Sequence, residues 1–313
     1  MVIRQILDVF DILDRPDASG EAMKQLLQSC GAGRVTVKKL SSPQGSTDGI
    51  RFFLPGSNGK SRGGDAPTLC IVGRLGGLGA RPALTGFVSD GDGALAVLAA
   101  ALKLGNMHAA GDQLPGDVVV CTHICPNAPT IPHDPVPMMG SPISILEMNR
   151  FEVDASADAV LSVDTTKGNK VMNQNGFAIS CTVKEGYILR ASDDLLNIMV
   201  RVTGKMPSVL PISQQDITPY GNGLYHINSV LQPAVATTAP VVGVAITTEQ
   251  PVAGCATGAT HFSDIEASAR FLIEVAKDFT QGRCTLYDAR EFQEILALYG
   301  EMTHFQTLGK HTV

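Results

Sequence analysis

The sequence predicts an α/β fold in which a mixed, mainly parallel central sheet is flanked by helices. Two observations lead to this prediction. Short apolar segments alternate with helix-like segments along most of the chain. Some apolar segments, such as residues 68–72, are continuous runs of the kind that lie in sheets covered on both faces. With 44% hydrophobic and 17% charged residues in 313, the chain can bury a large core.

The predicted elements follow in order along the chain. Two helices are expected at the N-terminus. The first is amphipathic, and Gly31-Ala32-Gly33 ends the second. Ser263 and Glu266 form a capping-box pattern before a late helix. Helices are expected at about residues 2–14, 18–31, 92–105, 141–150, 192–202, 263–279 and 289–301, and strands at about 35–40, 49–56, 68–72, 117–121, 159–163, 177–181 and 239–246.

The chain shows neither an internal repeat nor a long linker, so a single domain over residues 1–313 is expected. Within it, residues 1–33 are an N-terminal helical segment and residues 303–313 a loose tail. A net charge of -6 argues against nucleic acid as a partner, because phosphate binding needs clustered Lys and Arg. No apolar run reaches the roughly 18 residues that cross a bilayer. Seven irregularly spaced cysteines indicate free thiols and a cytoplasmic location.

The acidic turn, Ser89-Asp90-Gly91-Asp92-Gly93, is the most informative stretch of the chain. It lies where a strand passes into a long, almost uncharged helix, and ligands of α/β proteins bind at such strand ends. One carboxylate could hold a divalent cation while the other orients water. The alternative is that Asp90 or Asp92 only caps the helix.

Three further segments carry candidate chemistry. His123 ends a strand, where it could be a ligand, a base or a substrate donor, and Asp164 follows another buried strand. Cys125 could be a thiolate nucleophile. The segment 125–140 holds five prolines, which stiffen it and keep it out of a sheet, and it is expected to form a pocket wall.

A glycine-rich loop, residues 73–81, follows the strand 68–72 and carries Arg74 and Arg81. Its spacing is neither that of a phosphate-binding Walker loop nor that of a dinucleotide fingerprint. Two guanidinium groups on open backbone could bind a carboxylate or phosphate. The alternative is a tight crossover with salt-bridged arginines.

The order of these elements resembles the catalytic domain of the co-catalytic zinc exopeptidases and deacylases over residues 1–280. Asp90 matches the metal-bridging aspartate of that superfamily, and Asp164 matches a second metal ligand. The resemblance also implies a three-layer fold. The whole pattern further resembles a family of uncharacterised bacterial and archaeal proteins, domain-of-unknown-function family 1177, which implies no activity.

The ligand set departs from the superfamily elsewhere. Arg74 and Gly76 replace the histidine and aspartate of the expected His-x-Asp, and Thr122-His123 replaces the glutamate pair. The C-terminal histidine would fall near Gly254 or Cys255. A conventional dinuclear zinc site therefore cannot be built from the matching positions.

Two functions of different classes remain open. The first is a hydrolase-like enzyme acting on a small, anionic amide or peptide-like metabolite. Its altered site would hold one zinc or manganese ion on Asp90, Asp164 and His123, with His123 and Asp92 catalytic, and with Arg74 and Arg81 binding substrate. The second is a catalytically silent relative that binds a small anion or serves as a partner subunit. A Cys125-dependent enzyme is a third possibility. A core this apolar is also compatible with a homo-oligomer.

Overall fold

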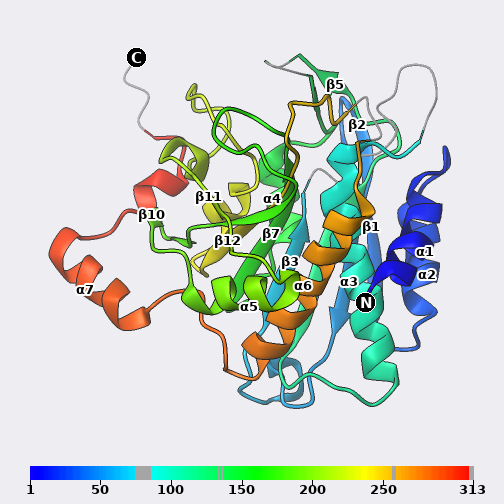
Figure 1. Cartoon of the computed structure of the whole chain (residues 1–313), viewed down its shortest axis with the longest axis horizontal. Helices are drawn as coiled ribbons and strands as arrows, with labels where there is room; N and C mark the ends of the chain where they lie inside the picture. Colours follow the sequence, from blue (N-terminus) through cyan, green and yellow to red (C-terminus); the bar gives the residue numbers. More distant parts are fainter. Residues whose placement is uncertain (75–85, 133, 135–136, 256–258, 310–313) are drawn as a thin grey trace.

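A mixed β-sheet forms the centre of the computed structural model, and helices cover it (Figure 1). The structure describes residues 1–74, 86–132, 134, 137–255 and 259–309. Gly76 and Arg81 therefore lie outside the described residues. Within these residues the sheet contains ten strands: β1 (Arg34–Ser42), β2 (Gly45–Leu54), β3 (Leu69–Gly73), β4 (Val118–Ile124), β7 (Ala159–Thr166), β8 (Gly176–Ser180), β9 (Val183–Lys184), β10 (Tyr187–Ile188), β11 (Val209–Leu210) and β12 (Val241–Thr247).

The main path of the sheet runs β1-β2-β4-β3-β7-β12-β8-β11. Its four central strands, β4, β3, β7 and β12, are parallel. Antiparallel pairing joins β1 to β2, β2 to β4 and β8 to β12, whereas β11 is parallel to β8. The carboxyl ends of the four central strands therefore meet at one edge of the sheet. The proline-rich segment was expected to stay out of a sheet, but β5 (Thr130–Ile131) and β6 (Met138–Met139) within it pair as a separate two-stranded antiparallel sheet. Neither strand joins the main sheet.

Helices pack on both faces of the sheet. The larger core lies between one sheet face and the helices α1, α2, α3, α5 and α6, and the smaller core lies on the other face. The described helices are α1 (Ile3–Leu13), α2 (Gly20–Gln28), α3 (Asp92–Ala109), α4 (Ile145–Glu152), α5 (Asp193–Thr203), α6 (Phe262–Thr280) and α7 (Ala289–Tyr299), with short 3-10 turns at Lys60–Arg62, Ser89–Gly91, Gln215–Ile217, Gln232–Ala236 and Thr303–Gln306.

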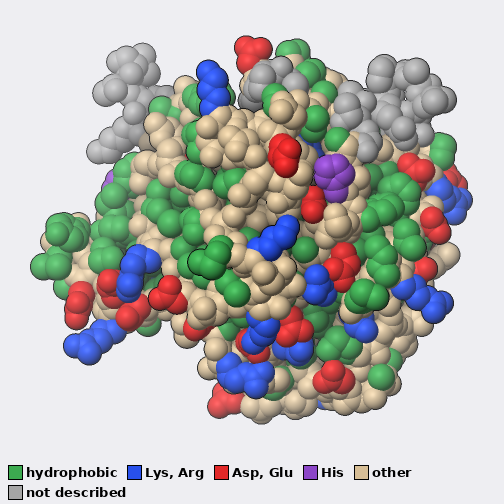
Figure 2. All heavy atoms as spheres, in the orientation of Figure 1, with side chains coloured by type: hydrophobic (Ala, Val, Ile, Leu, Met, Phe, Trp, Pro, Cys, Tyr) green, Lys and Arg blue, Asp and Glu red, His purple; other side chains and the backbone are tan. Residues whose placement is uncertain are grey.

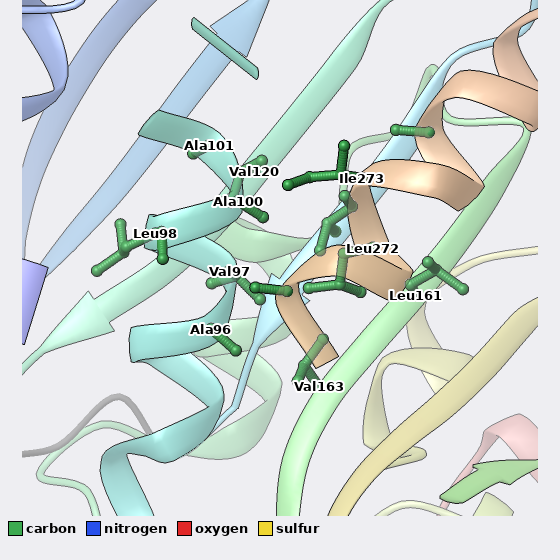
Figure 3. Packing of buried hydrophobic residues seen from close by; sticks show 14 of the residues in the cluster. Ala96, Val97, Leu98, Ala100, Ala101, Val120, Leu161, Val163, Leu272 and Ile273 are labelled. Carbon is green, nitrogen blue, oxygen red and sulfur yellow. The ribbon is translucent and has the colours of Figure 1, made fainter. Parts of the chain in front are cut away.

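Helix α3 is the centre of the larger core. Its residues from Asp92 to Leu102 are all buried, and it packs against α1 and α6 and over the central strands (Figure 3). Gly93 lets the first turn of α3 approach β7, because a Cβ at this position would lie 2.6 Å from the carbonyl oxygen of Val163. The acidic turn is thereby held against the carboxyl end of β7.

Two local expectations of the sequence differ from the structure. The capping box at Ser263 is wrong: α6 begins at Phe262, and the Glu266 carboxylate instead pairs with Arg270 at 2.7 Å. In the tail that was expected to be loose, residues Thr303–Gln306 form a 3-10 turn. The side-chain amide of Gln306 donates to the carbonyl oxygens of Ala234 and Thr237, which holds the turn against the body of the protein.

Acidic and basic side chains are interspersed on the face shown in Figure 2, with hydrophobic side chains between them. Among the described helices, none combines the length and the apolar character that a membrane crossing requires.

Candidate functional site

The carboxyl ends of the central strands gather most of the side chains that the sequence singled out. Arg74 follows β3, His123 lies near the end of β4 and Asp164 lies in β7. The backbone N–H of Arg74 donates to the carbonyl oxygen of Val163 at 2.6 Å, which ties the end of β3 to β7. The acidic turn lies beside them because Gly93, at the start of α3, packs closely against Val163 of β7. The structure therefore brings these residues to one edge of the sheet.

Asp90 is buried at this edge, with 6% of its surface exposed. Its Oδ1 accepts a hydrogen bond from the hydroxyl of Thr165 at 3.3 Å, and its Oδ2 accepts from the backbone N–H of Met139 at 3.1 Å. Burial raises the pKa of Asp90, while the Lys167 ammonium acts in the opposite direction. Neither Asp90 nor Asp92 caps α3, whose first turn receives no side-chain hydrogen bond from the described residues. The capping alternative is therefore wrong.

Gly254 packs directly against the Asp90 carboxylate. Its carbonyl oxygen accepts from the backbone N–H of Asp90 at 3.0 Å. A Cβ at Gly254 would lie 1.9 Å from Asp90 Oδ1, closer than any real contact. The position therefore requires glycine unless the carboxylate or the backbone moves.

Asp92 is more deeply buried than Asp90, with 1% of its surface exposed. Its Oδ1 accepts from the Thr260 hydroxyl at 2.7 Å, and its Oδ2 lies 3.7 Å from Lys167 Nζ. Burial raises the pKa of Asp92 to about 7, against the attraction of Lys167. A carboxyl group that titrates near neutral pH can take up or release protons under physiological conditions.

Asp164 is held by two donors. Its Oδ2 accepts from the Ser229 hydroxyl at 2.6 Å, and its Oδ1 accepts from the backbone N–H of Thr165 at 2.7 Å. Burial raises the pKa of Asp164 to about 6. Tyr220 lies near this pair, and burial followed by the Asp164 charge raises the pKa of its phenol. Tyr220 therefore stays protonated and remains a hydrogen-bond donor at neutral pH.

A cavity of about 1270 Å³ opens at this edge. Asp90, Lys167, Tyr220, Asn228 and Ser229 supply much of its polar lining. Its walls also include Asp134 and Pro137, which confirms the prediction that the proline-rich segment forms part of a pocket wall. His226 and Glu249 line it as well.

A second group of polar residues, which we call the buried polar cluster, lies beside the cavity but does not line it. It consists of Arg74, His123, Asn149 and Glu152, all buried. Arg74 Nε lies 3.3 Å from Glu152 Oε2, and His123 Nδ1 lies 2.9 Å from Glu152 Oε1. Asn149 Oδ1 accepts a hydrogen bond from Arg74, and its Nδ2 donates to the carbonyl oxygen of Gln232.

The buried polar cluster changes three of the predicted roles. Arg74 was expected to bind substrate, but it is 1% exposed and its charge is compensated by Glu152. His123 was expected to be a metal ligand and a catalytic residue, but its Nδ1 faces Glu152 instead of the cavity. Cys125 is 2% exposed, and burial raises the pKa of its thiol, which disfavours the thiolate that a nucleophile needs.

Three residues of this region, Asn149, Glu152 and Lys167, were not predicted from the sequence. Asn149 and Glu152 are three residues apart in α4, so they lie on one face, and that spacing was the available signal. Lys167 was missed because β7 was expected to end at Val163, whereas it continues to Thr166. The segment 164–167 (Asp-Thr-Thr-Lys) has two β-branched residues that favour such an extension.

The match to a known protein family covers residues 38–309, and the family is described as "Protein of unknown function (DUF1177)". The chain belongs to this family. No curated protein matches the sequence.

Solved structures similar to this chain share its fold. The bottromycin maturation enzyme BotP, in complex with Mn, is 15% identical over 90% of this chain and 71% of that chain, with a TM-score of 0.50. LapA of Legionella pneumophila is 9% identical over 88% of this chain and 71% of that chain, also with a TM-score of 0.50. A tomato leucine aminopeptidase mutant is 12% identical over 87% of this chain and 61% of that chain, with a TM-score of 0.48. BotP and LapA therefore share the α/β fold of this chain.

The residues present do not fit the two-metal site of the zinc exopeptidases that the sequence resembles. Among the described residues, no group of three or more His, Cys, Asp or Glu side chains could hold a metal ion. The expected trio of Asp90, Asp164 and His123 is therefore not assembled, since His123 faces Glu152. Arg74 brings a buried positive charge to one ligand position, and at Gly254 even a Cβ would collide with Asp90.

Proposed function

We propose that the protein is a hydrolase-like enzyme that acts on a small amide or peptide-like metabolite in the cavity beside Asp90. One observation carries the proposal: the Asp90 carboxylate, held in place by the bonds described above, opens into a cavity of about 1270 Å³ at the carboxyl ends of the central strands. Ligands of α/β proteins bind at this edge.

Asp90 is the proposed general base. Each of its oxygens accepts one hydrogen bond, from Thr165 or from Met139, so each retains a lone pair for a water molecule. The low-polarity surroundings that raise its pKa also make the carboxylate a stronger base when it is ionised. In the proposed reaction Asp90 takes a proton from water as the water attacks the substrate carbonyl.

Tyr220 is the proposed donor to the oxygen that gains negative charge during this attack. It lines the same cavity and stays protonated, and a donor fixed in advance stabilises such an oxyanion. Protonated Asp90 then returns its proton to the departing amine. The proton balance closes within the site, with water as the only co-reactant.

A direct test is amide hydrolysis by protein freed of metal. Purified protein would be dialysed against a chelator, analysed for metals and incubated with dipeptides, N-acyl amino acids and amino-acid amides, with product release measured by mass spectrometry. Asp90→Asn should lower kcat/KM by about a hundredfold or more, the usual scale for removing a general base. Asp112→Asn, which changes an exposed aspartate, is the matched control and should leave the rate unchanged.

The same experiment addresses the expected zinc or manganese ion. Two results together would overturn the metal-independent reaction and restore a single-metal site. The wild-type protein would bind nearly one metal ion per chain that Asp90→Asn does not bind, and it would hydrolyse amides only with that metal bound. Turnover by the metal-free protein would support the reaction proposed here.

The alternative is a catalytically silent protein that binds a small ligand. This function is favoured because Arg74 and Gly254 stand at positions where the resemblance predicts metal ligands. It requires the same cavity but no turnover. Measurable ligand binding with no hydrolysis of any compound in the set would select this alternative.

A further inference from the structure

We infer that the cavity holds the carboxylate of its ligand between Lys167 and Asn228. This inference rests on the proposed function for the reaction and adds the class of substrate: a small amino-acid derivative with an apolar side chain and one free carboxylate. Two buried donors without an acceptor among the residues that the structure describes carry it, Lys167 Nζ and Asn228 Nδ2. Both residues line the cavity.

Lys167 directly follows β7, and its side chain is 10% exposed. None of the described residues accepts a hydrogen bond from its ammonium group. Its nearest anionic oxygen, Asp92 Oδ2, lies 3.7 Å away, which suits an ion pair but exceeds a hydrogen bond. A buried ammonium without acceptors is costly, so an acceptor brought by a ligand would be bound strongly.

Asn228 comes to the cavity from a different part of the chain and is 7% exposed. Its Oδ1 accepts from the Thr166 hydroxyl at 3.0 Å, and this contact fixes the orientation of the amide. The Nδ2 group then has two N–H donors and no acceptor among the described residues. Thr166 immediately precedes Lys167, so the same strand end supplies one donor and positions the other.

A carboxylate suits these two donors. Its two oxygens can accept from Lys167 and from Asn228 at the same time, and the hydrogen bond to an ammonium is charge-assisted. A dianion such as a phosphate monoester is disfavoured, because the acidic side chains of Asp90, Asp134 and Glu249 line the same cavity. The ligand therefore carries a single negative charge.

The remaining wall selects for an apolar group. Leu224, Ile227 and Val252 line the cavity, and Leu224 and Ile227 are 53% and 49% exposed. Burying such side chains against a ligand removes apolar surface from water and favours binding. An amino-acid derivative meets both requirements, with its carboxylate at Lys167 and Asn228 and its side chain against this wall.

The test is calorimetric binding of N-acetyl-L-leucine and of its uncharged analogue, N-acetyl-L-leucinamide. The acid should bind at least about tenfold more tightly than the amide, the scale of one charge-assisted hydrogen bond. Lys167→Met and Asn228→Asp should each weaken binding of the acid by at least about tenfold. Asn228→Asp keeps the Oδ1 that Thr166 contacts but removes the two donors.

Lys205→Met is the matched control. It removes the same charge at an exposed position that does not line the cavity, and should change the affinity by less than about threefold. Circular dichroism and thermal unfolding establish that each variant folds. If Lys167→Met does not fold, Asn228→Asp still tests the site.

The outcomes separate this inference from the proposed function. Equal binding of the acid and the amide, no binding of the acid, or unchanged binding by the folded variants would each overturn the carboxylate site, even if amides are hydrolysed elsewhere in the cavity. Tight, Lys167-dependent binding of the acid with no hydrolysis of any substrate would support the carboxylate site and reject the enzyme.

Discussion

The buried polar cluster and the cavity lie at the same edge of the sheet but differ in their access to a ligand. Each group holds one cation beside a carboxylate, Arg74 beside Glu152 and Lys167 beside Asp92. Each also has buried donors with no acceptor among the described residues, on Arg74 in the cluster and on Lys167 and Asn228 in the cavity. Only Lys167 and Asn228 line the cavity, so a ligand can supply an acceptor to them but not to Arg74.

The largest effect on stability should come from breaking the cluster. Glu152→Gln removes the charge that compensates buried Arg74 and should lower the free energy of unfolding by about 3–5 kcal/mol. Chemical denaturation measures this loss. The double variant Arg74→Met with Glu152→Gln should recover part of it, because no uncompensated charge remains.

Glu274→Gln is the control for this comparison. Glu274 pairs with Lys277 and Arg201 at the surface, where its side chain is 30% exposed, so the loss should stay below about 1 kcal/mol. Equal effects of Glu152→Gln and Glu274→Gln would contradict a structural role for the cluster.

Stability should also depend on pH through Asp92. Its pKa is raised from 3.8 to about 7 in the folded protein, so the folded state binds more protons than the unfolded state between these values. The Asp92 contribution to the free energy of unfolding is therefore complete below about pH 4 and falls as the pH rises to 7. At 1.4 kcal/mol per pKa unit, up to about 4 kcal/mol is involved.

Asp92→Asn isolates that contribution, since Asn can still accept from the Thr260 hydroxyl. The variant should match the wild-type protein near pH 4 and be more stable at pH 8, as measured by denaturation at each pH. Parallel pH profiles for the two proteins would show that Asp92 has an ordinary pKa.

A smaller loss is expected from Gly254→Ala, which tests the closure over Asp90. The new Cβ would displace the carboxylate and should cost about 1–3 kcal/mol of stability, as overpacking does. Asp90→Ala in the same chain removes the colliding atoms. A double-mutant cycle should therefore show a favourable coupling, and simple additivity would argue against the contact.

The smallest effect concerns thiol reactivity. Six of the seven cysteines are buried, and Cys181 has intermediate exposure. Iodoacetamide at neutral pH should label Cys181 well before Cys125, whose thiol pKa is raised by burial. Peptide mapping over time gives the order. Preferential labelling of Cys125 would revive the thiolate nucleophile that its surroundings disfavour.

The fold could be predicted from the sequence more completely than the candidate site. Continuous apolar strands alternating with helices predicted the parallel centre of the sheet, and strand ends predicted that Asp90 and Asp164 would share an edge. The direction of each side chain at that edge could not be predicted. Arg74 turns into the protein because Glu152 compensates it, and Glu152 belongs to a helix that looks solvent-exposed in the sequence, with Arg150 and Glu147 nearby.

Helix α3 has a consequence for synthesis of the chain. Its almost uncharged surface packs between α1 and α6, yet α6 spans Phe262–Thr280 and leaves the ribosome late. Until then, the apolar surface of α3 that α6 buries stays exposed to water, and such surfaces promote aggregation. The nascent protein therefore depends on its C-terminal third to complete the core, and a ribosome that stalls before residue 280 would release a chain that needs a chaperone.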